Sequence, residues 1–212
     1  PDPLGPQCGL LILAKTFEWQ KVSRQSAVCT MCCPSAVRVR HPTQGRDVKQ
    51  EVGFGGGCHW CTEAVFQTLR GVKQVDQGFI CSSPPDDTWS EAVKVQFASE
   101  VFDLARLIDI HLHTHASTSQ HSMRAKYRSA IYVNSPQQAH EAKAILNDMQ
   151  HAFSEPLVTR VLPLVGFKSS EPGRRAYFEN NKGNQFCERY IEPKLKRLRD
   201  EYPHFVVGSK FE

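Results

Sequence analysis

Hydrophobic and polar residues follow regular patterns only after about residue 48 of this chain. In residues 1–47 the apolar positions recur with neither the period of 2 that is typical of strands nor the period of 3.6 that is typical of helices. Beyond them such patterns follow one another; residues 92–97, for example, alternate as Ala-Val-Lys-Val-Gln-Phe, which predicts a strand with one solvated face. We therefore expect residues 48–212 to form the folded domain. Residues 1–47 would be a leader, either a disordered tail or a transit-like segment.

The patterns predict a unit of strand, helix and strand that occurs twice in succession. Strands are expected at residues 52–54, 72–80, 92–97 and 128–133. Helices are expected at residues 60–69, just before Gly71, and at residues 102–112. This order of elements is typical of the split βαβ, or ferredoxin-like, arrangement. We therefore predict an α+β fold that is built on this core.

Further elements are predicted after residue 134. Ser135 and Pro136 form a helix start, and the helix would run to about residue 151. Residues 157–165 favour a strand that Pro163 interrupts. The remainder is helix-like and charged, which predicts additional helices and an irregular C-terminal wrap around the core. Its run Lys-Leu-Lys-Arg-Leu-Arg at residues 194–199 is expected to be a solvated helix face.

Three consecutive glycines and a cysteine separate the first predicted strand from the first predicted helix. Gly55, Gly56 and Gly57 let the backbone take a positive φ and approach a ligand closely. Cys58 follows at the start of the helix, where free N–H groups and a partial positive charge favour a thiolate. Cys61 lies one helical turn further on, within reach for a disulfide. The pattern therefore predicts a nucleophilic, redox-active Cys58.

Other interpretations of this cysteine pair remain open. Cys58 could be a buried structural cysteine, or the pair could be half of a zinc site. The remaining zinc ligands would come from a histidine group in which three members alternate, so that a strand would place them on one face: His111, His113, His115 and His121. A non-catalytic zinc-binding or regulatory module and a general thiol–disulfide oxidoreductase are therefore alternatives to a specific redox enzyme.

Composition and charge limit the class of protein. With 212 residues, 40% hydrophobic and 23% charged, the chain has the composition of a soluble globular protein with one sizeable core. No apolar stretch is long enough to span a membrane. The net charge of +4 belongs to residues 1–50, which hold seven Lys/Arg and three Asp/Glu, while residues 51–212 hold 19 of each. We therefore expect a monomer that binds neither nucleic acid nor membranes.

The eight cysteines divide evenly between the leader and the predicted domain. The four in the domain are Cys58, Cys61, Cys81 and Cys187. So few in a chain with a good-sized core do not resemble a secreted disulfide scaffold, which favours a reducing compartment. The leader is basic and poor in acidic residues, as transit segments are. We therefore expect the cytoplasm or, if the leader is a transit segment, a plastid or mitochondrion.

Three runs of residues carry a family resemblance. Residues 57–63 read Gly-Cys-His-Trp-Cys-Thr-Glu, residues 91–93 read Glu-Ala-Val, and residues 127–132 read Tyr-Arg-Ser-Ala-Ile-Tyr. In this order and at these separations they resemble methionine sulfoxide reductase A, the peptide-methionine (S)-S-oxide reductases, over roughly residues 50–150 and more weakly to about 180. The resemblance implies an oxidoreductase that reduces methionine S-sulfoxide, free or in proteins, as a protein-repair enzyme of the oxidative stress response. It also implies that no cofactor is bound and that thioredoxin is the external reductant.

The same resemblance assigns catalytic roles. Cys58 would attack the sulfoxide sulfur and become a sulfenic acid, which a second cysteine would resolve to a disulfide. Cys61 is the simplest second cysteine, whereas Cys187 and Cys81 are the alternatives and are expected to be packing residues. Glu91 would donate a proton or hydrogen bond to the sulfoxide oxygen, so its carboxyl should be protonated by a pKa that burial raises. Tyr127 would add a hydroxyl donor to the same oxygen.

The substrate-binding residues both follow the family pattern and depart from it. Trp60 would supply an apolar wall for the S-methyl group of the substrate. His59 stands where the family has phenylalanine, Phe79 where it has a tyrosine, and Ser122 where it has an aspartate. Only part of the donor set for the oxygen is therefore retained, and losing one such donor costs about 10²–10³-fold in rate in other oxyanion sites. The chain would be a divergent member that is slow or uses another donor, such as one of the histidines at 113, 115 and 121.

Overall fold

The computed structural model describes residues 49–207, which contain one sheet of six strands in the order β5-β4-β1-β3-β2-β6. Each of its four central strands is antiparallel to the central strand next to it: β1 (Lys49–Gly55), β2 (Val72–Cys81), β3 (Ser90–Ala98) and β4 (Ala130–Val133). The order β4-β1-β3-β2, with a helix after β1 and another after β3, is the split βαβ arrangement. The predicted α+β fold class is therefore confirmed.

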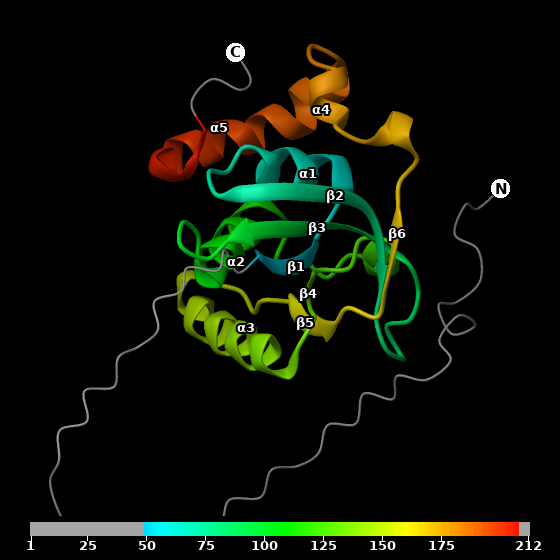
Figure 1. Ribbon diagram of the computed structural model, residues 1–212, viewed down its shortest axis with the longest axis vertical. Coiled ribbons are helices and arrows are strands. Elements are labelled where there is room, and N and C mark those ends of the chain that lie inside the picture. Colours follow the sequence, from blue (N-terminus) through cyan, green and yellow to red (C-terminus); the bar gives the residue numbers. More distant parts are fainter. Residues whose placement is uncertain (1–48, 208–212) are drawn as a thin grey trace, which may run out of the picture.

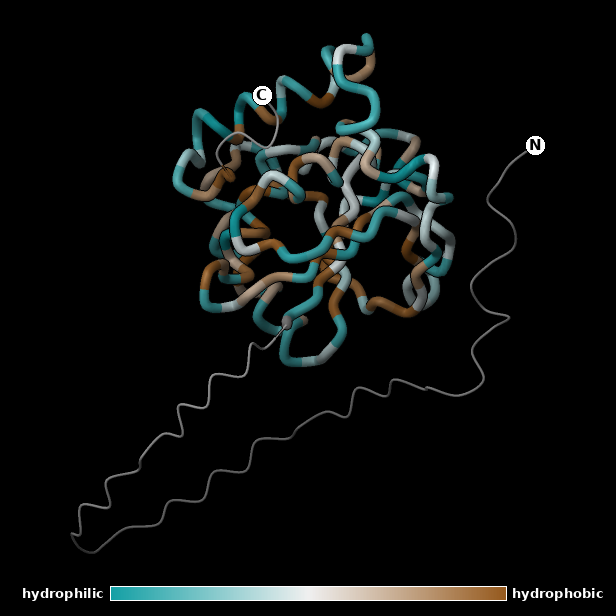
Figure 2. The backbone as a smooth tube through the Cα atoms, turned by 45° about the horizontal axis from the view of Figure 1, so that its top comes forward, coloured by the Kyte–Doolittle hydropathy of each residue, from teal (hydrophilic) through white to brown (hydrophobic). Residues whose placement is uncertain are grey.

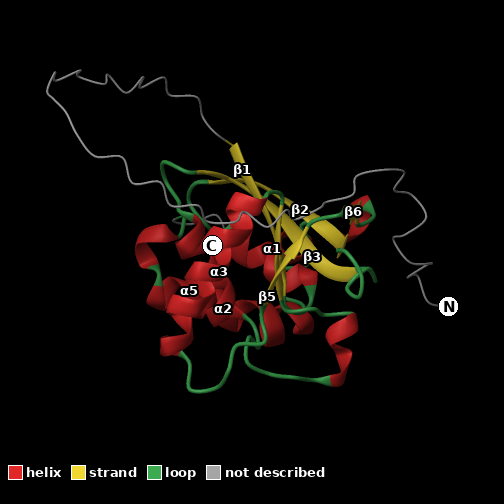
Figure 3. Ribbon diagram, turned by 90° about the horizontal axis from the view of Figure 1, so that it is seen from below, coloured by secondary structure: helices red, strands yellow, loops and turns green. Residues whose placement is uncertain are grey.

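The larger helices lie on one side of this sheet (Figure 3). They are α1 (His59–Gln67), α2 (Leu104–Thr114), α3 (Pro136–Met149) and α5 (Glu192–Glu201). Figure 1 shows α1 between the sheet and the C-terminal helices α4 (Tyr177–Asn180) and α5. A π-helix, Cys187–Ile191, directly precedes α5. The remaining helical turns of the described residues are 3-10 helices: Ser122–Ala125, Gln150–Ala152, Pro172–Arg174 and Pro203–Phe205.

The main hydrophobic core fills the space between the sheet and these helices. Val52 and Phe54 of β1 are fully buried there, and Phe54 stacks on Phe66 of α1 with ring centroids 4.5 Å apart. The alternate face of the sheet carries a smaller cluster that includes Ile80 and Tyr132. Along the backbone, brown and teal residues are mixed in the strands, whereas teal predominates along the C-terminal helices (Figure 2). Burial on one helix-covered face thus fixes the register of β1 and with it the position of the turn that follows.

Two predicted elements differ in the structure. The interrupted strand expected at residues 157–165 is instead two strands, β5 (Arg160–Pro163) and β6 (Gly166–Ser169). They pair at opposite edges of the sheet, β5 parallel to β4 and β6 antiparallel to β2, because Pro163 ends the first and the chain then crosses the sheet. His111 and His113 lie on α2, which ends at Thr114, and His115 caps it, so the histidines do not have the one-face arrangement that a strand would give them.

The predicted leader, residues 1–47, lies outside the described residues. Within residues 49–207, no helix combines the length and the apolar character that crossing a bilayer requires.

Candidate active site

The glycine turn between β1 and α1 depends on glycine at successive positions. A Cβ atom on Gly55 would lie 2.7 Å from the carbonyl oxygen of Arg128, and one on Gly56 would lie 2.5 Å from the ring of His115. Gly57 has φ +156°, a conformation that side-chain-bearing residues rarely adopt. The turn therefore packs too closely for larger residues and delivers Cys58 to the N-cap position of α1.

The environment of Cys58 stabilises its thiolate. A hydrogen bond from the Cys61 thiol lowers the pKa of Cys58 most strongly, and the backbone N–H groups of Trp60 and Cys61 lower it further. Burial and the negative charge of Glu91 oppose this shift without reversing it. The Cys61 thiol has a strongly raised pKa, because the Cys58 sulfur holds its proton and because Cys61 is buried. The pair thus consists of a half-buried thiolate at Cys58 and a buried, protonated thiol at Cys61.

Glu91 lies over the same helix N-terminus. It belongs to β3 opposite Phe79 of β2, and only 8% of its surface is exposed. Its Oε2 accepts a hydrogen bond from the backbone N–H of His59 at 3.2 Å. The His59 side chain donates from Nδ1 to the carbonyl oxygen of Gly78 at 3.0 Å, which holds the ring between Glu91 and the sheet. The carboxyl group is therefore fixed at the N-terminus of α1, close enough to Cys58 for its charge to act on that thiol.

A lysine that the sequence analysis did not consider reaches the other oxygen of this carboxyl group. The ammonium of Lys126 lies 3.6 Å from Glu91 Oε1 and 5.0 Å from the ring centroid of Tyr127. A hydrogen bond with the Tyr127 side chain, and then the charge of Glu91, raise the pKa of Lys126 above its usual value. Tyr127 thus joins the site through Lys126. The signal in the sequence was the position of Lys126 directly before the Tyr-Arg-Ser-Ala run.

Aromatic rings form the apolar side of the site. The ring of Trp60 stacks on that of Tyr177 of α4 with centroids 3.9 Å apart. Phe186 packs edge-on against the Trp60 ring with centroids 5.4 Å apart. On the opposite side, the edge of Phe79 meets His59 at 5.3 Å. The predicted residues His59, Trp60 and Phe79 are therefore brought together, and the C-terminal segment contributes rings that no periodic pattern indicated.

The remaining cysteines lie deeper. Cys187, in the π-helix, is fully buried, and its charge when ionised would raise the pKa of Cys61, so the two sulfurs are near each other. The Cys61 sulfur also lies 3.7 Å from the carbonyl oxygen of Tyr190 in the same π-helix, which is an alternative acceptor for its single thiol proton. Cys81, buried at the end of β2, is disulfide-bonded, so the expectation that it is a packing thiol or an alternative resolving cysteine is wrong. These positions rank Cys61 ahead of Cys187 as the thiol nearest to Cys58.

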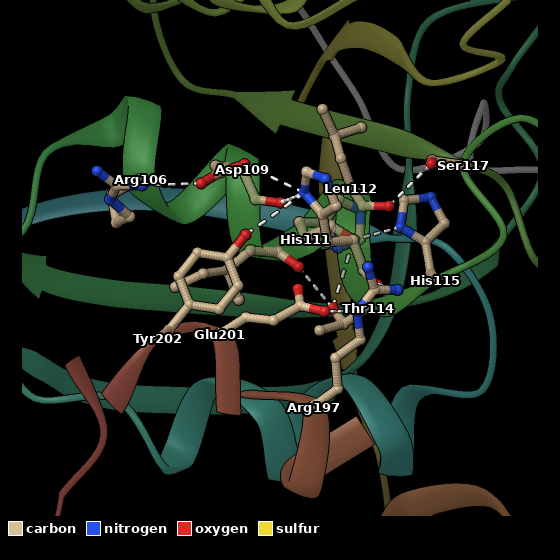
Figure 4. Close-up of polar contacts among 12 residues, drawn as sticks. Arg106, Asp109, His111, Leu112, Thr114, His115, Ser117, Arg197, Glu201 and Tyr202 are labelled. Carbon is tan, nitrogen blue, oxygen red and sulfur yellow. Dashed lines mark hydrogen bonds and ion pairs between the residues drawn. The ribbon is translucent and has the colours of Figure 1, made fainter. Parts of the chain in front are cut away.

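The prediction that residues 194–199 form a solvated helix face is wrong for Lys194. Its side chain is half-buried, and its ammonium donates to the carbonyl oxygen of Thr114 at the end of α2. Burial lowers the pKa of Lys194, while the negative charges that Cys61 and Cys58 can carry act in the opposite direction. The reason is that α5 packs on α1 and α2, and Arg197 also donates to the His113 carbonyl oxygen at 2.8 Å (Figure 4).

Two of the predicted histidines support the glycine turn. His111 donates from Nε2 to the Gly55 carbonyl oxygen at 3.0 Å. His115 donates from Nδ1 to the His111 carbonyl oxygen at 2.6 Å, so its Nε2 accepts from the Ser129 hydroxyl at 2.8 Å. Their rings stack at 4.1 Å near the end of α2 (Figure 4). Burial lowers the pKa of His111 well below its usual value and that of His115 to about 4, so both are neutral at neutral pH.

The other two histidines do not join the site. His113 lies against Asp109 and Phe153 on another side of α2, and His121 is exposed. Across residues 49–207, no three side chains of His, Cys, Asp or Glu are grouped so that they could hold a metal ion. The described residues therefore supply no support for the zinc interpretation of the cysteine pair.

The buried histidines predict a loss of stability in mild acid. An unfolded histidine binds a proton below about pH 6.5, whereas folded His115 does so only near pH 4, so folding is disfavoured as the pH falls through this interval. The free energy of unfolding should drop by about 3 kcal/mol from His115, and His111 acts in the same direction. Urea unfolding at about pH 7 and about pH 4.5 measures the difference. The variant His115→Gln should reduce this drop and the exposed-site control His140→Gln should not; an equal drop in all three proteins would contradict the prediction.

Comparisons with known proteins point in one direction. The family model described as peptide methionine sulfoxide reductase matches residues 50–205. Peptide methionine sulfoxide reductase MsrA of Deinococcus radiodurans is 32% identical over 176 residues, covering 76% of this chain and 85% of the relative. Mxr1 from Saccharomyces cerevisiae in reduced form is similar in fold, with a TM-score of 0.58 and 21% identity over 66% of this chain and 89% of that one. Mxr1 in complex with Trx2 gives a TM-score of 0.50 and 18% identity, with 58% and 81% coverage.

Proposed function

This chain belongs to the peptide methionine sulfoxide reductase family, and from that premise we propose that it reduces methionine S-sulfoxide, free or in proteins, to methionine through Cys58. The observation that carries the proposal is the state of one sulfur atom. Cys58 is half-buried at the N-terminus of α1, its pKa is lowered, and a carboxyl group and an indole flank it. A low pKa together with partial exposure is what distinguishes a reactive cysteine from a structural one.

The proposed first step transfers one oxygen atom. The Cys58 thiolate attacks the substrate sulfur, the S–O bond of the sulfoxide breaks, and an S–O bond forms on Cys58 with uptake of one proton. The substrate sulfur is reduced by two electrons and Cys58 is oxidised by two. Methionine leaves, and Cys58 remains as a sulfenic acid. In this proposal the Glu91 carboxylate takes up a proton when the substrate binds and then donates a proton or hydrogen bond to the oxygen, and Tyr127 is a second donor.

The substrate would lie against the aromatic side of the site. Trp60 is the apolar wall for the S-methyl group, and its stacking on Tyr177 holds the indole in place. His59 and Phe79 close the opposite side, where the histidine ring is already committed to the Gly78 carbonyl oxygen. The backbone N–H of the same residue holds Glu91 in place. Oxidised methionine side chains in peptides therefore fit this site by an apolar methyl contact and a polar oxygen contact.

Cys61 is the proposed resolving cysteine. Its thiol already hydrogen-bonds the Cys58 sulfur, so attack on the sulfenic acid forms the disulfide and releases water with little movement. Oxidation of Cys58 removes the neighbour that contributes most to the raised pKa of Cys61, which favours its ionisation at that moment. Cys187 is the reserve candidate, because it is buried within a π-helix that would have to open.

Thioredoxin is the proposed external reductant, and no bound cofactor is required. The yeast relative of the same fold has been solved in complex with Trx2, which supports this choice. The family match over residues 50–205 supports residues 48–212 as the reductase domain. A monomer is the proposed state. The cytoplasm, or an organelle if residues 1–47 act as a transit segment, stays the proposed location.

Stoichiometric oxidation tests the proposal. One equivalent of a peptide that contains methionine S-sulfoxide, with no other reductant, should yield about one methionine per chain and a Cys58–Cys61 disulfide. Peptide mapping by mass spectrometry identifies the bond, and the R-sulfoxide serves as the control substrate. A Cys58–Cys187 disulfide would transfer the resolving role to Cys187. Absence of methionine release, with bound zinc or with reduction of insulin disulfides, would replace the proposal by one of its two alternatives.

A further inference from the structure

Lys126 offers an unassigned cation beside the carboxyl group of Glu91. Glu91 uses Oε2 to accept from the His59 N–H, which leaves Oε1 facing Lys126 at 3.6 Å. This distance exceeds that of a full hydrogen bond, and an ammonium carries three N–H groups, so one beyond the Tyr127 contact remains to donate to a ligand. Since 45% of the lysine side chain is exposed, a bound substrate can reach it.

The backbone fixes where this lysine lies. The Lys126 carbonyl oxygen accepts from the Glu91 N–H at 2.9 Å and from the Ser90 hydroxyl at 3.0 Å, which ties the residue to the start of β3. The ring of Tyr127 lies beneath its ammonium. The lysine is therefore aimed across the mouth of the site by contacts on both its backbone and its side chain. A surface ion pair alone contributes little to stability and needs no such anchoring.

The site is short of donors without it. Phe79, which pairs with Glu91 across the sheet, presents a ring edge that carries no hydroxyl group. The side-chain Nδ1 of His59 donates to Gly78, and the N–H groups of Trp60 and Cys61 face the Cys58 sulfur. A sulfoxide oxygen gains negative charge as its S–O bond breaks, and a fixed cation at that position is worth far more in the transition state than in the ground state.

Resting on the proposed function, we propose that Lys126 is a catalytic residue, whose ammonium donates a hydrogen bond to the sulfoxide oxygen beside Glu91. The net proton of the reaction still comes from Glu91 or water, so Lys126 ends the step in the charge state in which it began. Its raised pKa keeps it protonated at neutral pH. The lysine thereby supplies the polar contact that the ring of Phe79 cannot supply.

Turnover of a methionine S-sulfoxide peptide by the full chain tests this assignment. Lys126→Met should lower kcat/KM by about 10–100-fold, chiefly through kcat, and Lys126→Arg should restore most of it. The control Lys143→Met removes an exposed lysine of α3 and should have no effect. Methionine, which lacks the oxygen, should inhibit wild type and Lys126→Met with the same inhibition constant. The alkylation rate of Cys58 should also be unchanged, since Lys126 is not among the groups that set its pKa.

The outcomes separate this assignment from the function on which it rests. If the wild-type chain releases no methionine, the proposed function itself fails. If the wild type turns over and Lys126→Met stays within about twofold of it, only the role of Lys126 is overturned. A loss in Lys126→Met that is accompanied by weaker methionine inhibition, or that Lys126→Arg repeats in full, indicates a merely structural role and also overturns the assignment.

Discussion

Replacing Cys58 with serine should abolish methionine release, with a fall in kcat on the order of 10⁴-fold or more, as is found when a catalytic nucleophile is removed. A hydroxyl group titrates far above the thiol range, so the N–H groups of Trp60 and Cys61 that help to stabilise the thiolate cannot ionise it. The substitution removes one sulfur atom and preserves the shape of the turn. The fold should therefore stay intact, which thermal unfolding would verify.

A matched control comes from the same chain. Cys187→Ser makes the same chemical change at a fully buried position. The proposed first step does not involve Cys187, so this variant should still release one methionine per chain. Thiol alkylation provides a second measurement. In the wild type, Cys58 should be the thiol that is alkylated fastest. In Cys58→Ser, Cys61 should ionise more readily than in the wild type, because the hydrogen bond with the Cys58 sulfur that contributes most to its raised pKa is gone. Normal methionine release by Cys58→Ser would refute the mechanism.

Replacing Glu91 with glutamine should lower the rate of sulfenic acid formation by about 10²–10³-fold. Glutamine keeps an acceptor for the His59 N–H, which Glu91 now holds at 3.2 Å, but it supplies neither an acidic proton nor a negative charge. Because the charge of Glu91 raises the pKa of Cys58, the same variant should make Cys58 easier to ionise. Sulfoxide reduction should therefore fall while alkylation of Cys58 in mildly acidic solution becomes faster.

These opposite changes are what make the Glu91 experiment decisive. Rapid-mixing measurements of methionine release and of iodoacetamide labelling, made on the same preparation, report the two rates. Glu51→Gln is the control. Glu51 of β1 pairs with Lys94 of β3 at 3.2 Å, and its replacement should change neither the methionine-release rate nor the labelling rate. A parallel loss of both rates in Glu91→Gln would mean that the substitution disturbs the helix N-terminus, and would contradict the donor role.

The local chemistry of the nucleophile was readable from sequence. Three glycines before Cys58 predicted a tight turn, and a helix-forming run after it predicted an N-terminus that favours the thiolate. Both are short-range effects, which depend on residues within one turn of the cysteine. The ferredoxin-like order of elements was predictable for a similar reason, because the periods of 2 and 3.6 report which faces are buried.

Contacts between distant segments were decided only by the tertiary structure. Lys126 meets Glu91 across 35 positions of chain, and Tyr177 reaches Trp60 from the C-terminal segment, because helix packing and sheet pairing bring these segments together. Lys194 appeared to belong to a charged surface run until α5 was seen packed against α2. His111 of α2 reaches the Gly55 carbonyl oxygen, a contact that the alternation of the histidines did not indicate. The sequence thus determined the local turn and helix N-terminus that stabilise the Cys58 thiolate. Which distant residues contact this site depends on which surfaces the whole chain buries.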